Sequence, residues 1–167
     1  IKKYPNNYKF YINYSNQFQI DNDNDKALEY INKAYEIAPY NILVRENRGQ
    51  ILFNISYDCI KQQDEFENIE LDKSKCYEYA YKSITDLNFV IEKKENSGAL
   101  FTLARLHLYV LENEGEKAIG FYKKYINNYY PNSWRSYRMI GEAYMDLNDS
   151  DKSIKYFDLA IEKLSLL

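Results

Sequence analysis

The stretch KALEYINKAYEIAP at residues 26–39 decides the fold class. Its apolar residues recur three and four positions apart, and this spacing places Ala27, Ile31 and Ala34 on one face of an amphipathic helix. Pro39 ends the helix, because proline has no amide hydrogen and its ring clashes with the preceding turn. The small alanines on the face predict close packing against a second helix.

The same pattern occurs three more times along the chain. The copies are KSITDLNFVI at 82–91, KAIGFYKKYI at 117–126 and SIKYFDLAI at 153–161. Glycine and proline are scarce, with 5 and 3 among 167 residues, and the alternating pattern of strands is absent. Because a partner helical pattern precedes each copy, the sequence predicts an all-α fold built from antiparallel helical hairpins.

These paired helices resemble the tetratricopeptide repeat, a helix–turn–helix unit of 34 residues. Its bulky and small positions are matched in the first pair by Tyr11, Tyr14, Ser15, Phe18, Ala27, Ile31, Ala34 and Pro39, and in the last pair by Tyr137, Ile140, Gly141, Tyr144, Ser153, Phe157 and Ala160. The resemblance implies an α-solenoid, a right-handed superhelix that forms a single domain over residues 1–167. Its expected repeats are 8–41, 42–97, 100–133 and 134–167.

The second of these repeats carries an insertion. Gly49 and Ser83 hold two small-residue positions and lie 34 residues apart, whereas the repeat separates these positions by 12, so 22 residues are added. If each helix gains 11 residues, about three turns, both apolar faces keep their phase. We therefore predict an overlong hairpin that projects roughly 16 Å past its neighbours. Its acidic tip would be QQDEFENIELDKSK at 62–75.

The two cysteines, Cys59 and Cys76, lie in the two helices of this predicted hairpin. Two cysteines are too few for a disulfide framework or a zinc site. They could face each other across the hairpin, but we expect two separate buried thiols. The only histidine, His107, is expected to be a packed helix residue, since no cysteine or carboxylate pair accompanies it.

Composition and motifs exclude several classes of function. The formal charge of -3 is spread along the chain without a Lys/Arg block, so we expect no nucleic-acid partner. No apolar run approaches the roughly 18 residues that span a bilayer, so we expect no membrane insertion. The chain has no Gly-rich phosphate loop, no nucleophile elbow and no acid/base pair. We therefore predict a cytoplasmic protein that is not an enzyme and needs no cofactor and no metal.

The resemblance also implies where a protein or peptide ligand would bind. The first helix of each repeat would line a concave groove. Asn13 and Asn47 fall at the same repeat position, where a carboxamide can donate to and accept from a peptide backbone. The predicted groove residues are Asn13, Asn16, Glu46, Asn47, Gln50, Arg105, Arg135 and Arg138. The arginines would supply planar donors for a carboxylate or an acidic peptide.

Three functional interpretations stay open. The first is a scaffold or adaptor that binds a peptide or a partner domain, in the groove or on the long hairpin. The second is a regulatory or sensor segment of a larger multidomain enzyme or complex. The third, and the least favoured, is a co-chaperone-type carboxylate clamp. Asn16, Asn47 and Arg105 match the clamp pattern, but Ile12 and Phe101 replace its two lysines.

The predicted last helix ends in KLSLL at 163–167 without a polar capping helix after it. We expect its leucines to be covered by a missing segment, a second copy of the chain or a partner; they are Leu164, Leu166 and Leu167. Since the chain begins at Ile1 rather than Met, we also expect a fragment of a longer protein.

Overall fold

The computed structural model describes residues 6–64, 73–94 and 96–166. These residues form eight helices and no strand: α1 (Tyr8–Ile20), α2 (Asn24–Ile37), α3 (Ile42–Asp64), α4 (Ser74–Lys93), α5 (Ser97–Tyr109), α6 (Gly115–Asn128), α7 (Trp134–Asp146) and α8 (Ser150–Leu164). The predicted all-α solenoid of helical hairpins is confirmed. Most of the predicted acidic tip (65–72) and Leu167 lie outside the described residues.

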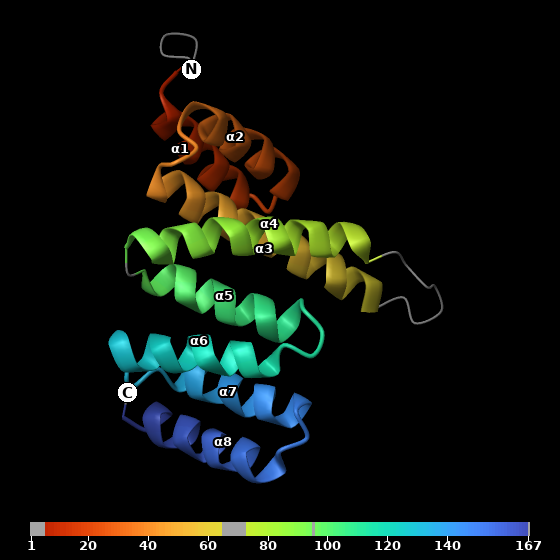
Figure 1. The fold of residues 1–167 in the computed structure, drawn as a ribbon, viewed down its shortest axis with the longest axis vertical. Coiled ribbons are helices and arrows are strands. Elements are labelled where there is room, and N and C mark those ends of the chain that lie inside the picture. Colours follow the sequence, from red (N-terminus) through yellow and green to blue (C-terminus); the bar gives the residue numbers. More distant parts are fainter. Residues whose placement is uncertain (1–5, 65–72, 95, 167) are drawn as a thin grey trace. The chain divides into compact units, whose positions relative to one another are not determined.

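The contacts divide the chain into two compact units, Ile1–Ala99 and Leu100–Leu167. In the first unit α1 packs against α2, and α3 packs against α4 (Figure 1). A contact between α2 and α3 joins these two hairpins. In the second unit α7 packs against both α6 and α8. The count of four repeats and the single domain over 1–167 stay predictions.

Asparagine and aspartate set the turns within the hairpins. Three asparagines adopt positive φ angles in the turns between consecutive helices: Asn22 (56°), Asn113 (60°) and Asn148 (58°). Asparagine tolerates this left-handed conformation better than other residues with a side chain. Asp23 and Asp149 follow two of them and cap α2 and α8, accepting hydrogen bonds from the backbone N–H of Lys26 and Lys152 at 3.1 and 3.2 Å. The abundant asparagines thus have a local structural role.

Small residues let the helices of a hairpin approach each other, as the resemblance implied. Ala27, Ser83, Ala118 and Ser153, the four residues at the first small position of each second helix, are buried. On the first helix of the last hairpin, a methyl group added at Gly141 would lie 2.8 Å from the ring of Phe157. The close approach of α7 and α8 at this point therefore depends on the absence of a side chain at Gly141.

Replacing Gly141 with alanine is expected to lower the free energy of unfolding by about 1–3 kcal/mol, because the added methyl group overpacks the contact with Phe157. Gly120 is the matched control, since a methyl group there meets nothing within 4 Å. Gly120→Ala should raise stability by about 0.5–1 kcal/mol through the better helix propensity of alanine. Urea unfolding followed by circular dichroism measures both, and equal stabilities of the two variants would contradict the packing argument.

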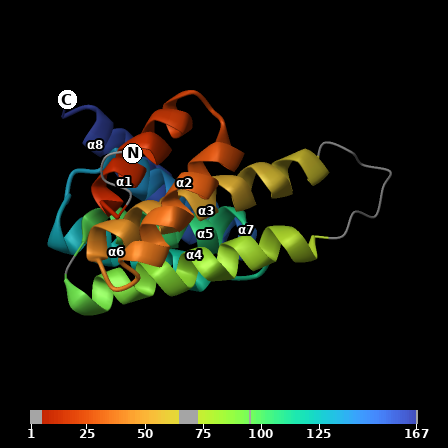
Figure 2. The same ribbon diagram turned by 90° about the horizontal axis from the view of Figure 1, so that it is seen from above.

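The predicted overlong hairpin is present in α3 and α4. These helices contain 23 and 20 residues, whereas the other six contain 13 to 15. Figures 1 and 2 show their far ends extending together past α1 and α2. Ten extra residues in α3 relative to α1 correspond to roughly 15 Å at 1.5 Å per residue. The insertion is not shared evenly, because α4 gains only six residues relative to α6.

Cys59 and Cys76 form a disulfide across this hairpin, so the expectation of two separate buried thiols was wrong. Their Cα atoms lie 5.6 Å apart, within the range that a disulfide requires. The bond links α3 to the first turn of α4 and closes a segment of 17 residues. Spacing alone did not reveal the pair, because the register between the two helices depends on how the insertion divides.

Candidate protein-interaction surfaces

Five of the predicted groove residues lie on α1 and α3 of the first unit, two helices that are in contact. Asn13 is exposed, while Asn16, Glu46, Asn47 and Gln50 are half-buried. All five side chains are therefore accessible on helices whose other faces form the core. The set contains four carboxamides and one carboxylate, so it offers both hydrogen-bond donors and acceptors.

Two of these carboxamides already bond within α3. The Asn47 side-chain amide donates to the carbonyl of Leu43 at 2.7 Å, and the Gln50 amide donates to Oδ1 of Asn54 at 3.2 Å. Each bond follows the i to i+4 spacing of a helix surface. A ligand that needs these donors would have to compete with the helix for them, whereas Asn13 is more exposed than either residue.

The three predicted arginines belong to the second unit and have different environments. Arg138 forms an ion pair with Glu142 one turn further along α7. The other oxygen of that carboxylate accepts a hydrogen bond of 2.7 Å from the Tyr109 hydroxyl. Burial, with this bond to Glu142 as the second cause, raises the pKa of Tyr109. Arg105 on α5 is half-buried. The guanidinium of Arg138 is thus neutralised by its neighbour rather than fully available to a ligand.

Arg135 instead lines an open pocket of about 410 Å³ at the turn between α6 and α7. The remaining lining is mainly aromatic: Tyr125, Tyr129, Tyr130, Pro131, Asn132, Ser133 and Trp134. The rings of Tyr125 and Tyr130 lie 4.9 Å apart, and the Arg135 guanidinium lies 5.4 Å from the Trp134 ring centre. Arg135 was predicted from the sequence as a groove residue, but the aromatic pocket around it was not, although four aromatic residues within ten positions were a readable signal.

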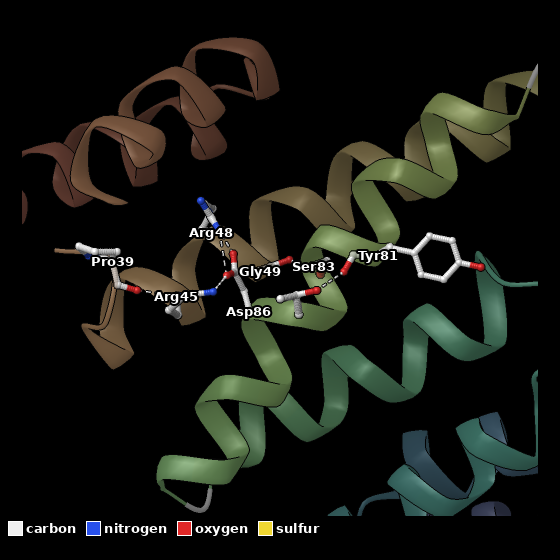
Figure 3. A network of polar contacts seen from close by, with 8 residues as sticks. Pro39, Arg45, Arg48, Gly49, Tyr81, Ser83 and Asp86 are labelled. Carbon is white, nitrogen blue, oxygen red and sulfur yellow. Dashed lines mark hydrogen bonds and ion pairs between the residues drawn. The ribbon is translucent and has the colours of Figure 1, made fainter. Parts of the chain in front are cut away.

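A buried cluster of charges in the first unit was also missed. Asp86 on α4 is fully buried and accepts hydrogen bonds from Arg45 at 2.6 Å and from Arg48 at 2.6 and 2.9 Å (Figure 3). The Arg45 Nε also donates to the carbonyl of Pro39 at 2.7 Å. One carboxylate therefore forms ion pairs with two guanidinium groups. These contacts link α4 to α3 through residues that are 38 to 41 positions apart in the sequence.

Aromatic rings complete the surroundings of the two arginines. The Arg48 guanidinium lies 3.2 Å from the ring centre of Tyr35, and that of Arg45 lies 4.8 Å from the ring centres of both Tyr35 and Phe89. Such rings stabilise a partly desolvated cation. By register these arginines hold repeat positions that usually carry bulky apolar side chains, and this departure was the signal that could have predicted the cluster.

The described part of the chain contains no cluster of metal-ligating side chains. In residues 6–64, 73–94 and 96–166 no group of three or more His, Cys, Asp or Glu side chains could hold a metal ion. His107 is buried with its ring stacked on Phe121 at 5.5 Å, as expected for a packed helix residue. Burial lowers the pKa of His107. None of the described helices is both long and apolar enough to cross a membrane.

Comparisons with known proteins agree with this architecture. A family model of the tetratricopeptide repeat matches residues 8–41 and 135–162. A crystal structure of MamA superposes with a TM-score of 0.74 at 23% identity, covering 98% of this chain and 82% of that chain. The structure of MamA MSR-1 C2 gives a TM-score of 0.72 at 18% identity, covering 95% and 78%. A comparison with curated protein sequences found no match.

The fold therefore defines a helical-hairpin solenoid, a class that serves in general as a protein–protein interaction module. Two segments of the chain, residues 8–41 and 135–162, match the tetratricopeptide-repeat family, and the chain has the fold of tetratricopeptide-repeat proteins. Proteins of this family are typically non-catalytic and bind other proteins or peptides.

Proposed function

We propose that the first unit holds an extended segment of a partner protein against the polar faces of α1 and α3. The observation that carries the proposal is the accessible set of carboxamides on these two adjacent helices, with Asn13 as its most exposed member. Carboxamides bond to the backbone of a peptide without selecting its side chains. The same face would serve in a scaffold or in a regulatory segment of a larger protein.

The charges of this face favour a peptide that is neutral or carries a basic side chain. Glu46 is the only charged member of the set, and α1 contains Lys9 but no carboxylate from Tyr8 to Ile20. A co-chaperone-type clamp has little support, because Ile12, which takes the place of one clamp lysine, is 4% exposed and belongs to the core. The preferred ligand is therefore an internal extended segment rather than a free C-terminal carboxylate.

The aromatic pocket of the second unit supports a further contact with the partner. Tyrosine, tryptophan and arginine are the residue types that supply most binding energy at protein interfaces, and all three line this pocket. We propose that it receives an apolar or aromatic side chain, with Arg135 at its rim.

Replacing Asn13 and Asn47 together with alanine is expected to weaken peptide capture about thirtyfold, since two net hydrogen bonds of about 1 kcal/mol each are lost. The measurement is fluorescence anisotropy with peptides selected from a random displayed library on the unaltered protein. Helical content should not change, because neither side chain is buried.

The matched control replaces Asn127 and Asn128, two exposed asparagines of α6, with alanine. This control should bind the selected peptides with unchanged affinity. Equal affinities for all three proteins would overturn the proposal that α1 and α3 form the binding face. Loss of affinity in the control as well would show a nonspecific effect of removing asparagine.

A further inference from the structure

The outer face of α8 exposes two isoleucines whose counterparts elsewhere in the second unit are covered. Ile154 is 60% exposed and Ile161 67%. Aligning the repeats pairs them with Ile119 and Ile126 of α6, which are each 6% exposed. The same two positions of the repeat are therefore core in α6 and solvent-facing in α8.

In α6 this face is covered by the following helix. Met139, Ile140 and Ala143 of α7 belong to one hydrophobic cluster with Ile119 and Ile126. The first unit shows the same trend, since the corresponding α2 residues, Leu28 and Tyr35, are partly buried and pack against a cluster that includes Val44 of α3. The exposed face of α8 thus resembles the faces that, elsewhere in the chain, are covered by the first helix of the next hairpin.

α1 is a first helix whose corresponding face is open. Tyr14 and Gln17 align with the buried α7 residues Ile140 and Ala143. Yet Gln17 is exposed, and Tyr14 is 45% exposed. Ile20, one turn further along the same side, is 73% exposed. One chain therefore carries both halves of the contact that joins successive hairpins, and both halves face solvent.

The charges select α1 rather than a second α8 as the occupant. Asp158 lies on the same helix face as Ile154 and Ile161, because it is four residues after one and three before the other. Pairing two α8 helices would bring these carboxylates together, a repulsive arrangement. α1 presents no carboxylate from Tyr8 to Ile20 and offers Lys9 and carboxamides instead.

We infer that the exposed face of α8 binds α1 of a second copy of this chain, head to tail. The two contacting surfaces differ, so the contact is heterologous, and a dimer held by one such contact keeps one free α1 and one free α8. Assemblies then grow beyond dimers as the concentration rises.

The test is the mass of the 167-residue chain in solution, measured by sedimentation equilibrium over a range of concentrations. The unaltered chain should gain mass with concentration past that of a dimer. Ile154→Glu with Ile161→Glu on α8, and Gln17→Glu with Ile20→Glu on α1, should each weaken association about tenfold or more. All four residues are exposed, so circular dichroism should show unchanged folding.

An equimolar mixture of the two variants should form a dimer and nothing larger, because each variant keeps one intact face. Tyr81→Glu is the matched control, since this α4 residue is 60% exposed outside both faces, and it should associate like the unaltered chain. A monomer at all concentrations would overturn the inference. It would also be overturned if the α8 variant dissociates while the α1 variant still dimerises, because that result means α8 pairs with α8.

Discussion

Replacing Asp86 with alanine is expected to lower the free energy of unfolding of the first unit by about 3–5 kcal/mol. The carboxylate is fully buried, and the side chains of Arg45 and Arg48 are only 11% and 15% exposed. Without the carboxylate, two guanidinium groups remain close together, largely removed from water and without a counter-charge. Removing one partner of such a cluster costs more than the cluster itself contributes.

Two further variants separate charge from shape. Asp86→Asn keeps the size of the side chain but removes the negative charge, so it should destabilise the unit almost as much as alanine. Replacing all three residues together, as Arg45→Met, Arg48→Leu and Asp86→Leu, should restore most of the stability, because no buried charge is then unpaired. Urea unfolding followed by circular dichroism provides the measurement. A loss below about 1 kcal/mol in Asp86→Ala would mean that the arginines are well solvated without the carboxylate.

Reducing the disulfide between Cys59 and Cys76 is expected to lower the free energy of unfolding by about 3 kcal/mol, the chain-entropy value for a closed segment of 17 residues. The effect should be greatest at the projecting end of the hairpin, which has only two helices to pack together. Hydrogen exchange should therefore accelerate first in the last turns of α3 and the first turns of α4.

The measurement compares urea unfolding with and without a phosphine reductant. The double variant Cys59→Ser/Cys76→Ser is the control. Its free energy of unfolding should equal that of the reduced protein and should not change when the reductant is added. Detection of two reactive thiols in the folded, unreduced protein would contradict the bond. Disulfides persist mainly in oxidising compartments, so this bond weighs against the cytoplasmic location, which stays a prediction.

Much of the local structure could be predicted from the sequence because it depends on neighbouring residues. The spacing of Ala27, Ile31 and Ala34 is repeated wherever a second helix forms, and proline and capping aspartates mark the ends. The length of the second hairpin followed from counting residues between Gly49 and Ser83, since whole helical turns preserve the buried face. The proposed groove asparagines came from the same register.

Two of the features that sequence analysis missed depend on residues that are distant in the sequence. Asp86 meets Arg45 and Arg48 only after α4 has folded back on α3, and nothing in the local pattern of either helix fixes that pairing. The disulfide likewise depends on the unequal division of the insertion between the two helices. Repeat position alone also did not show that Arg138 forms an ion pair with Glu142. Nor did it show that Arg135 lines an aromatic pocket.

The exposed face of α8 shows most clearly which properties follow from the sequence pattern and which depend on packing. Its sequence repeats the apolar positions of α6, so the spacing of these residues is enough to predict that α8 is an amphipathic helix of the same kind. That the face of α6 is core and the face of α8 is surface follows from packing, because burial depends on whether a neighbouring helix lies over the side chains. Periodicity determines which residues share a face, and packing determines what that face contacts.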